Sequence, residues 1–374
     1  MSDRSVHPDR RIRVAVVFGG RSSEHAISCI TAGSVMAAID RDRYEVVPVG
    51  IARDGRWVLA TADLRLAIEG GRLPEVTGEG TALALPFDPE ARGLMVVEPG
   101  DVPSTLAAVD VVIPLLHGPY GEDGTIQGLL ELAGIRYVGA GVLASAVGMD
   151  KAFMKAVWAG QGLPLGPYVV VKDRDWRRER KRMIDEIKEL GWPVFVKPAR
   201  AGSSMGISKV DAEADLEAAV ETAREHDPKV LVEAAIDGRE IECGVLEGLD
   251  DNPPDASLPS EVNIAAGHDY YDFEAKYLDD GLRLDIPPNL PEAVIEDVRR
   301  LAAKAFDALG CEGLARVDFF HTRDGRLLLN EINTMPGFTP ASAFPKMWAA
   351  TGLDYPALVD RLIQTALRRP TGLR

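Results

Sequence analysis

Apolar positions follow two patterns along this chain, which are short continuous runs and longer stretches where apolar residues recur every three or four positions. The first run, Val14 to Phe18, ends at Gly19-Gly20, and helical spacing then continues to Ile39. This change of period predicts a strand, a turn and a helix. Strands over 44–51 and 109–116 and a helix over 125–133 are predicted in the same way. Alternating strands and helices indicate a mostly parallel sheet covered by helices.

The rest of the chain continues as two further units. In the first of these, helices and strands are predicted over 151–161, 168–172, 176–190, 194–197, 211–226 and 230–235. The last unit has a strand pair around Asp324-Gly325 and helices over 291–309 and 355–367. Because 374 residues exceed the size of most single cores, we expect several domains and place them at 1–144, 145–236 and 237–374. Residues 60–105, interrupted by Gly and Pro, give no clear prediction.

The strand pair around Asp324-Gly325 carries the most distinctive polar residues. Asp-Gly is a favoured two-residue hairpin turn, and such a turn places Asp318 opposite Glu331 and Arg316 opposite Asn333, all on one face. Facing carboxylates repel unless a cation lies between them or one is protonated. Mg²⁺ prefers such oxygen ligands, so a magnesium site is one interpretation. A solvated polar face on a surface hairpin explains these residues equally well when they are taken alone.

Charge and cysteine content narrow the class of protein. A formal net charge of −16 argues against nucleic acid or an anionic membrane as the main partner. The three cysteines are far apart and form no Cys-x-x-Cys pair, which disfavours a zinc site and a disulfide framework. The N-terminus has no apolar run long enough for a signal peptide or a membrane span, so we expect a cytoplasmic protein.

Two segments could bind a nucleotide. Lys197 is followed by a loop rich in Gly and Ser, where backbone N–H groups can surround an anion, and Lys151 could add a second charge. The chain has no Walker motif, and a flexible connection with a solvated lysine is the alternative. Glu233 and Glu240 could hold ribose hydroxyls and an adenine amino group, although two surface acids would look the same.

Other polar residues follow the strands of the first unit and the C-terminal hairpin. Glu24 and His117 each follow a predicted strand, so they are expected at the edge of the sheet where ligands bind, and Glu24 could receive an ammonium group. Helix capping and a structural histidine are the alternatives. Gly337 could expose an N–H to a developing oxyanion, a role that Arg316 could share. An ordinary Pro-Gly turn between two elements is the alternative.

In this order, the segments resemble the D-alanine:D-alanine ligases of the ATP-grasp superfamily over nearly the whole chain. The motifs that carry the resemblance are Gly19-Gly20-x3-Glu24-His25-x2-Ser28, His117-Gly118-x2-Gly121-Glu122-Asp123-Gly124, Lys197-Pro198, Gly202-Ser203-Ser204-Met205-Gly206, Glu274-Ala275-Lys276-Tyr277, and Arg316-x-Asp318 with Glu331-x-Asn333-x2-Pro336-Gly337. The resemblance implies a three-domain ATP-grasp architecture with an N-terminal mostly parallel α/β domain. It also implies ligation of two D-alanine molecules through a D-alanyl phosphate, with ATP consumed, for peptidoglycan precursors.

The resemblance also implies roles for individual residues. ATP would be bound by Lys151, Lys197, Glu233, Ile236 and Glu240. Asp318, Glu331 and Asn333 would bind two Mg²⁺ ions, or Mn²⁺. Glu24, with His117 nearby, would hold the first D-alanine, Ser342 the second, and Lys276 the transferred phosphate. Arg316 and the Gly337 N–H would stabilise the oxyanion. Glu24, Ser203 and Tyr277 would form a hydrogen-bonded trio that closes a lid, residues 260–285, over the site.

The resemblance leaves specificity and assembly less defined. Similar ligases that make D-alanyl-D-lactate lack the Lys-Tyr pair of the lid, so Tyr277 favours an amine as second substrate and argues less clearly against D-serine. A homodimer is expected from the family. A nucleotide-binding protein without turnover would need a damaged set of catalytic residues, and an NAD-dependent oxidoreductase would need a Gly-x-Gly-x-x-Gly motif; the chain shows neither.

Overall fold

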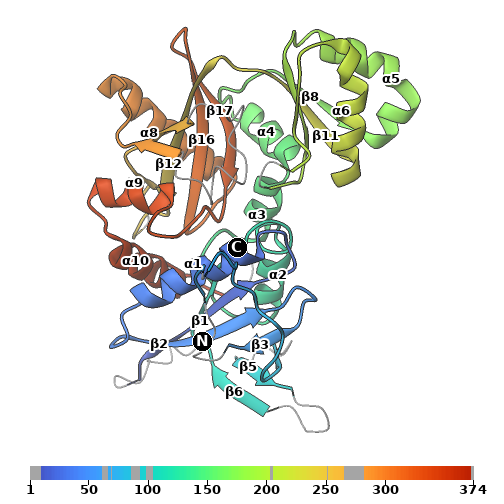
Figure 1. The fold of residues 1–374 in the computed structure, drawn as a ribbon. Coiled ribbons are helices and arrows are strands. Elements are labelled where there is room, and N and C mark those ends of the chain that lie inside the picture. The colour runs from blue at the N-terminus through green and yellow to red at the C-terminus, as the bar shows by residue number, and fades with distance from the viewer. Residues whose placement is uncertain are drawn as a thin grey trace.

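The computed structural model describes residues 10–60, 66–68, 70–85, 93–97, 104–202, 205–250, 252–264 and 282–371. Strands in these ranges form one small and three larger sheets, and the larger ones follow one another along the chain (Figure 1). No helix within these ranges combines the length and apolar character that crossing a bilayer requires. The three sheets follow the order of the predicted units, while the domain boundaries stay predictions.

The first sheet is built around β1 (Ile12–Gly19), which pairs in parallel with β2 (Tyr44–Ile51) and β7 (Val111–Pro114). An antiparallel strand, β3 (Trp57–Leu59), lies at one edge. Val14 to Phe18 are almost completely buried, which explains the continuous apolar run. The mostly parallel sheet predicted for this part of the chain is confirmed.

A small antiparallel sheet lies mostly within residues 60–105, for which no structure was predicted. It consists of β4 (Leu83–Ala84), β5 (Gly93–Val96) and β6 (Ser104–Ala108). Strands this short contain too few residues for a reliable periodic pattern.

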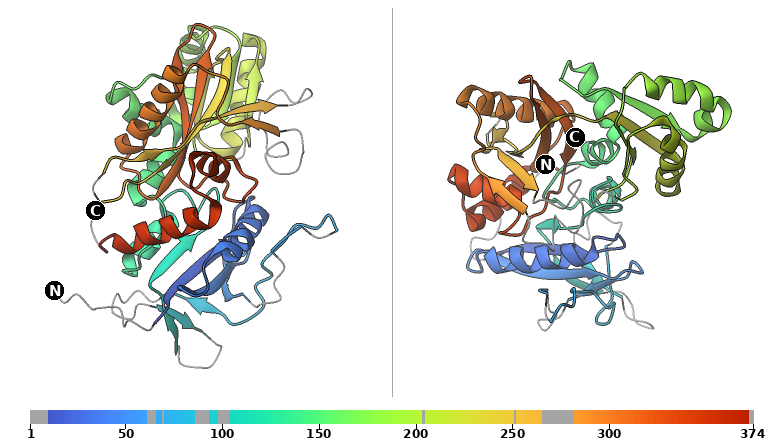
Figure 2. Two further views of the ribbon diagram at one scale, coloured as in Figure 1. Left: turned by 90° about the vertical axis from the view of Figure 1, so that its left-hand side faces the viewer. Right: turned by 45° about the horizontal axis from the view of Figure 1, so that its top comes forward.

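Helices from both ends of the chain pack together beside the first sheet. α1 (His25–Ala38) follows β1, and α10 (Tyr355–Arg368) is the last helix of the chain. Leu358 and Leu362 of α10 share a buried core with Val35 of α1 and Ile113 of β7. The C-terminal helix therefore attaches the end of the chain to its beginning (Figures 1 and 2).

Three helices lead from the first sheet to the other two: α2 (Thr125–Leu132), α3 (Val142–Met149) and α4 (Lys151–Gly160). Asp150 caps the N-terminus of α4, where its side chain accepts hydrogen bonds from the N–H groups of Ala152 and Phe153. At its other end, the indole of Trp158 is fully buried and donates to the Ala305 carbonyl at 3.1 Å. α4 is thus fixed against the third sheet and its covering helix.

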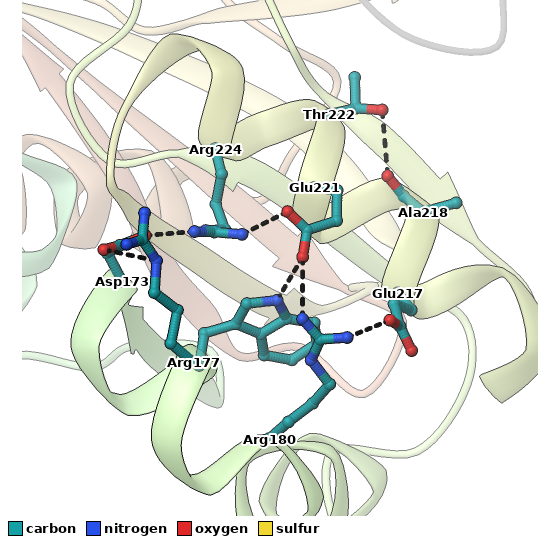
Figure 3. Close-up of polar contacts among 9 residues, drawn as sticks. Asp173, Arg177, Arg180, Glu217, Ala218, Glu221, Thr222 and Arg224 are labelled. Atoms are coloured by element: carbon teal, nitrogen blue, oxygen red, sulfur yellow. Dashed lines mark hydrogen bonds and ion pairs between the residues drawn. The ribbon is translucent and has the colours of Figure 1, made fainter.

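The second sheet is antiparallel throughout, in the order β10 (Ser208–Val210), β9 (Val194–Pro198), β11 (Lys229–Ala234) and β8 (Tyr168–Lys172). α5 (Asp173–Lys188) and α6 (Glu213–His226) cover one face, and Trp176 is buried in the core between them. On the outer side, Glu221 accepts from the Trp176 indole at 2.8 Å and from Arg224, which also contacts Asp173 (Figure 3). These contacts join the two helices.

The third sheet has the order β15 (Leu282–Asp285), β14 (Ser260–Ile264), β12 (Gly238–Leu246), β16 (Leu314–Thr322) and β17 (Leu327–Asn333), and β13 (Asp255–Ala256) pairs with β12. α8 (Glu292–Ala308) packs against it, and α9 (Ala343–Thr351) lies beside β12. The predicted helix over 291–309 is confirmed to within one residue at each end.

The hairpin prediction is right at the polar residues and wrong at the turn. The loop contains three residues, because Thr322 and Arg326 close it and Gly325 alone takes a positive φ of 85°. Next to the loop, Phe319 therefore pairs with Leu329, one position away from the predicted register. A bulge at Asn330 then restores the predicted partners, so Asp318 faces Glu331 and Arg316 faces Asn333.

Candidate active site

A cavity of about 390 Å³ lies between the second and third sheets. Nine of the residues predicted to bind or act on substrate line it: Lys151, Lys197, Glu233, Ile236, Glu240, Arg316, Asp318, Glu331 and Asn333. They come from the start of α4, from strands of both sheets and, for Ile236, from the connection between β11 and β12; the two sheets stand on either side of α4 (Figure 1). Segments far apart in the sequence thus line the same cavity.

Two lysines and a glutamate form a buried cluster on one wall. Glu233 of β11 contacts the ammonium group of Lys197 and accepts from Lys155 Nζ at 2.7 Å. Burial alone would raise the pKa of Glu233, but the two ammonium groups outweigh it and lower this pKa to about 2. Glu233 is therefore a fixed anion at neutral pH.

Three carboxylates stand in a row across the opposite wall. The register of β12, β16 and β17 places Glu242, Asp318 and Glu331 directly beside one another. Arg316 donates two hydrogen bonds of 2.7 Å to Asp318 and lies 3.3 Å from Glu242. Lys151 Nζ lies 3.3 Å from Glu331. The row is thus balanced by cations from two different elements.

The predicted metal ligands fit a divalent cation by their chemistry. Asp318 and Glu331 supply carboxylate oxygens on one face, and the Asn333 side chain reaches Asp318 at 3.1 Å. Within the described ranges, no three His, Cys, Asp or Glu side chains converge as metal ligands, so the Asn333 amide is needed for a third one. A bound cation would replace part of the contact between Asp318 and Arg316.

A second polar group lies at the carboxyl edge of the first sheet, beside the cavity. Glu24 is 7% exposed, makes no capping bond to α1, and its Oε2 lies 3.3 Å from where a Cβ on Gly202 would stand. The hydroxyl of Ser22 donates to the His117 carbonyl at 2.7 Å, which joins the two loops. Glu24 and His117 are therefore neighbours, as expected for two loops at one sheet edge.

Glu122 connects this group to the C-terminal part of the chain. Its carboxyl group accepts from the Gly118 N–H at 2.6 Å and from the Met335 N–H at 3.3 Å. Burial raises the pKa of Glu122 to about 8, and the negative charge of Glu24 acts in the same direction. Burial also lowers the pKa of His117, whose Nδ1 contacts the Met335 carbonyl at 3.2 Å. This end of the site is rich in acidic groups.

The remaining predicted residues are not all brought to the cavity. Gly337 and Ser342 do not line it, and the Ser342 hydroxyl instead accepts from the Thr339 N–H at 3.2 Å where α9 begins. Ser203, Lys276 and Tyr277 lie outside the described residues. Of the predicted lid, the described parts are β14 and β15.

Three residues of the site were missed as ligands or positioning groups: Lys155, Glu122 and Glu242. Lys155 could have been found because it lies four residues after Lys151, on the same face of a helix. Glu242 lies two residues after Glu240 and thus on the same face of a strand. Glu122 belongs to a motif that the sequence had singled out, but only the fold shows its contact with Met335.

Comparison with known proteins decides the family. A model described as "D-ala D-ala ligase N-terminus" matches residues 13–140, and one described as "D-ala D-ala ligase C-terminus" matches residues 157–364. The chain belongs to the D-alanine–D-alanine ligase family. The predicted enzyme class, an ATP-dependent ligase, is thereby confirmed.

Individual relatives in the D-alanine–D-alanine ligase family cover almost all of the chain. A protein named D-alanine–D-alanine ligase from Streptomyces coelicolor is 60% identical over 97% of this chain and 95% of its own length. One with the same name from Kineococcus radiotolerans is 59% identical over 97% and 98%. Among solved structures, the VanG D-Ala:D-Ser ligase from Enterococcus faecalis is 33% identical, with a TM-score of 0.81 over 96% of this chain and 100% of its own. The predicted ATP-grasp fold is confirmed.

Proposed function

We propose that this chain joins two D-alanine molecules to D-alanyl-D-alanine, with ATP converted to ADP and phosphate. The observation that carries the proposal is the facing of Asp318 and Glu331 inside a cavity that also holds Lys151, Lys197 and Arg316. Phosphoryl transfer needs such a combination of cations and metal ligands around the phosphates. Relatives near 60% identity carry the corresponding name.

The cavity offers a nucleotide two kinds of contact. The ammonium groups of Lys151 and Lys197 lie in the cavity, each beside a carboxylate, and would bind phosphate oxygens there. Glu233, Glu240 and Ile236 would contact the adenine ring and the ribose. Asp318, Glu331 and Asn333 would hold Mg²⁺ or Mn²⁺, whose positive charge would lower the cost of bringing phosphate oxygens together.

The reaction would proceed in two steps at the junction of the cavity and the first sheet. Glu24 would hold the ammonium group of the first D-alanine, and the carboxylate of that D-alanine would attack the γ-phosphorus of ATP. The bond to the β,γ-bridging oxygen would break, so that D-alanyl phosphate forms and ADP leaves. The amine of the second D-alanine, having lost a proton, would then attack the carbonyl carbon. Arg316 and the Gly337 N–H would stabilise the tetrahedral oxyanion until phosphate leaves.

The acidic residues at the edge of the first sheet suit this order of events. The buried carboxyls of Glu24 and Glu122 make the edge of the first sheet favourable for an ammonium group. A lid that includes Lys276 and Tyr277, closed by contacts among Glu24, Ser203 and Tyr277, would exclude water from the acyl phosphate, which otherwise hydrolyses. Ser342, at the start of α9, would bind the carboxylate of the second D-alanine.

The dipeptide would enter peptidoglycan precursor synthesis in the cytoplasm, and the chain would act as a homodimer.

Phosphate release with product identification tests this proposal. The purified chain would be given ATP and Mg²⁺ with D-alanine, with L-alanine, or with D-alanine plus D-serine or D-lactate. Release with D-alanine and a D-alanyl-D-alanine product support the proposal. A mixed product with D-serine would move the assignment toward the specificity named for the Enterococcus faecalis neighbour, and no release with any substrate would refute it.

A further inference from the structure

Lys155 is the most deeply buried lysine of the cavity, with 2% of its side chain exposed. Its ammonium group donates to Glu233 Oε1 at 2.7 Å and to the Asn330 carbonyl at 3.0 Å, and it lies 5.9 Å from the centre of the Tyr168 ring. Two of the three N–H groups of Lys155 thus have hydrogen-bond acceptors, and the Tyr168 ring lies within cation–π distance. Lys155 on α4 therefore joins the second sheet to the third.

The contact with Asn330 matters because of the bulge in β17. Asn330 is the extra residue, with no partner on β16, and its carbonyl is held by Lys155. Without the bulge, the pairing of Phe319 with Leu329 would continue and place Asn330, not Glu331, opposite Asp318. The bulge thus determines that two carboxylates face each other.

The contact with Glu233 acts on the other wall. Glu233 lies between Lys155 and Lys197, which hold one carboxylate oxygen each. Loss of Lys155 would leave one oxygen of a buried carboxylate and a backbone carbonyl without their donor. Both walls of the cavity would then lose a fixed point.

We propose that Lys155 is a positioning residue, which fixes Glu233 in the nucleotide pocket and stabilises the Asn330 bulge that sets Glu331 opposite Asp318. The proposal rests on the proposed function, because it assumes that the cavity binds a nucleotide with a divalent cation. It assigns Lys155 no contact with the reacting atoms.

Equilibrium binding of ADP, measured by calorimetry with and without Mg²⁺, tests the proposal without turnover. Lys155→Met should weaken ADP binding about tenfold or more, the cost of one lost hydrogen bond to a charged group. It should also raise the Mg²⁺ concentration that half-maximally tightens ADP binding. Glu233→Gln keeps the lysine contact with Asn330 and should weaken ADP binding without changing the Mg²⁺ response. Lys304→Met, at an exposed position of α8, is the matched control and should change neither.

Kinetics separate positioning from a general loss of structure. Lys155→Met should raise the KM for ATP and leave the KM for D-alanine within about twofold. A lower kcat with both KM values and the Mg²⁺ response unchanged would overturn the proposal. If the Met variant does not fold, Lys155→Arg replaces it, because arginine keeps the charge but presents a rigid planar group. Weaker ADP binding with a higher Mg²⁺ requirement in this variant supports the proposal, and unchanged titrations overturn it. Binding of ADP by the unmodified chain without dipeptide formation would instead refute the proposed function.

Discussion

The two ends of the site balance buried charge in opposite ways. At the end proposed to bind the nucleotide, Glu233 has two lysines as partners, which outweigh its burial and lower its pKa to about 2. At the end proposed to bind the amino acids, burial raises the pKa of Glu122 to about 8 and the negative charge of Glu24 acts in the same direction, although two backbone N–H groups donate to the Glu122 carboxyl group. At the first end, the protein itself supplies the cations that compensate the buried carboxylate. At the second end, a cationic ligand such as the ammonium group of an amino acid would compensate the negative charge.

The largest effect is expected where the two ends meet, at Arg316. Arg316→Ala should lower kcat by about 10²–10³, because an oxyanion contact and the partner of Asp318 are both lost. Arg316→Lys is the comparison, because it keeps one charge but cannot donate two parallel bonds. Rates of dipeptide formation measure the effect. An Arg316→Ala protein with the turnover of the unmodified chain would remove the residue from the mechanism.

Glu24 tests whether the amino-acid end accepts an ammonium group. Glu24→Gln keeps the size of the side chain but removes its charge, so the KM for the first D-alanine should rise by about tenfold to a hundredfold. The KM for ATP should stay the same, since Glu24 does not line the nucleotide cavity. Initial rates over both substrates give the two constants. Equal rises in both would mean that the variant disturbs the whole site.

The pH dependence of the free energy of unfolding tests whether Glu122 is buried with too little compensating positive charge. A carboxyl group whose pKa is raised on folding contributes stability that is complete below about pH 4.5 and is lost as pH rises toward 8. Glu122→Gln stays neutral, so its stability relative to the unmodified chain should improve between pH 5 and 9 by a few kcal/mol, on the order of the pKa shift. One lost N–H contact adds a constant cost of about 1 kcal/mol. Denaturant unfolding of both proteins at several pH values measures the trend, and a pH-independent difference would contradict it.

The smallest effect is expected on the outer face of the second sheet, far from both ends. Arg182 pairs with Glu179 and Glu186 along the exposed side of α5. Such solvated pairs contribute little, so Arg182→Ala should leave the Tm and all kinetic constants unchanged within error. Thermal unfolding and steady-state rates provide the check. A changed KM for ATP would show that the helical layer influences the cavity.

Much of the fold was predictable because the local patterns agree with the tertiary structure. β2 and β8 match their predicted ranges, and α1 and α10 match closely. The strands β12, β14 and β15 and the helices α3 and α9 were not predicted. α3 is apolar over most of its length, and such a segment has no polar face to reveal its period.

The predicted pairs Asp318–Glu331 and Arg316–Asn333 are right although the predicted turn between the two strands is wrong. The predicted two-residue turn is a three-residue loop, and the bulge at Asn330 compensates for it. A bulge leaves little trace in the sequence, and the Asn330 carbonyl at this one accepts a hydrogen bond from Lys155, which lies far away in the chain. The contact of Glu122 with Met335 was missed for the same reason, because it depends on an element far away in the chain.

The transfer of ¹⁸O from the substrate to phosphate tests the central claim most directly. D-alanine labelled with ¹⁸O in its carboxylate would be incubated with the chain, unlabelled ATP and Mg²⁺, and the phosphate analysed by mass. A D-alanyl phosphate intermediate predicts one ¹⁸O atom in each phosphate, because the carboxylate oxygen bonded to phosphorus leaves with it. Dipeptide formation with unlabelled phosphate would contradict the mechanism.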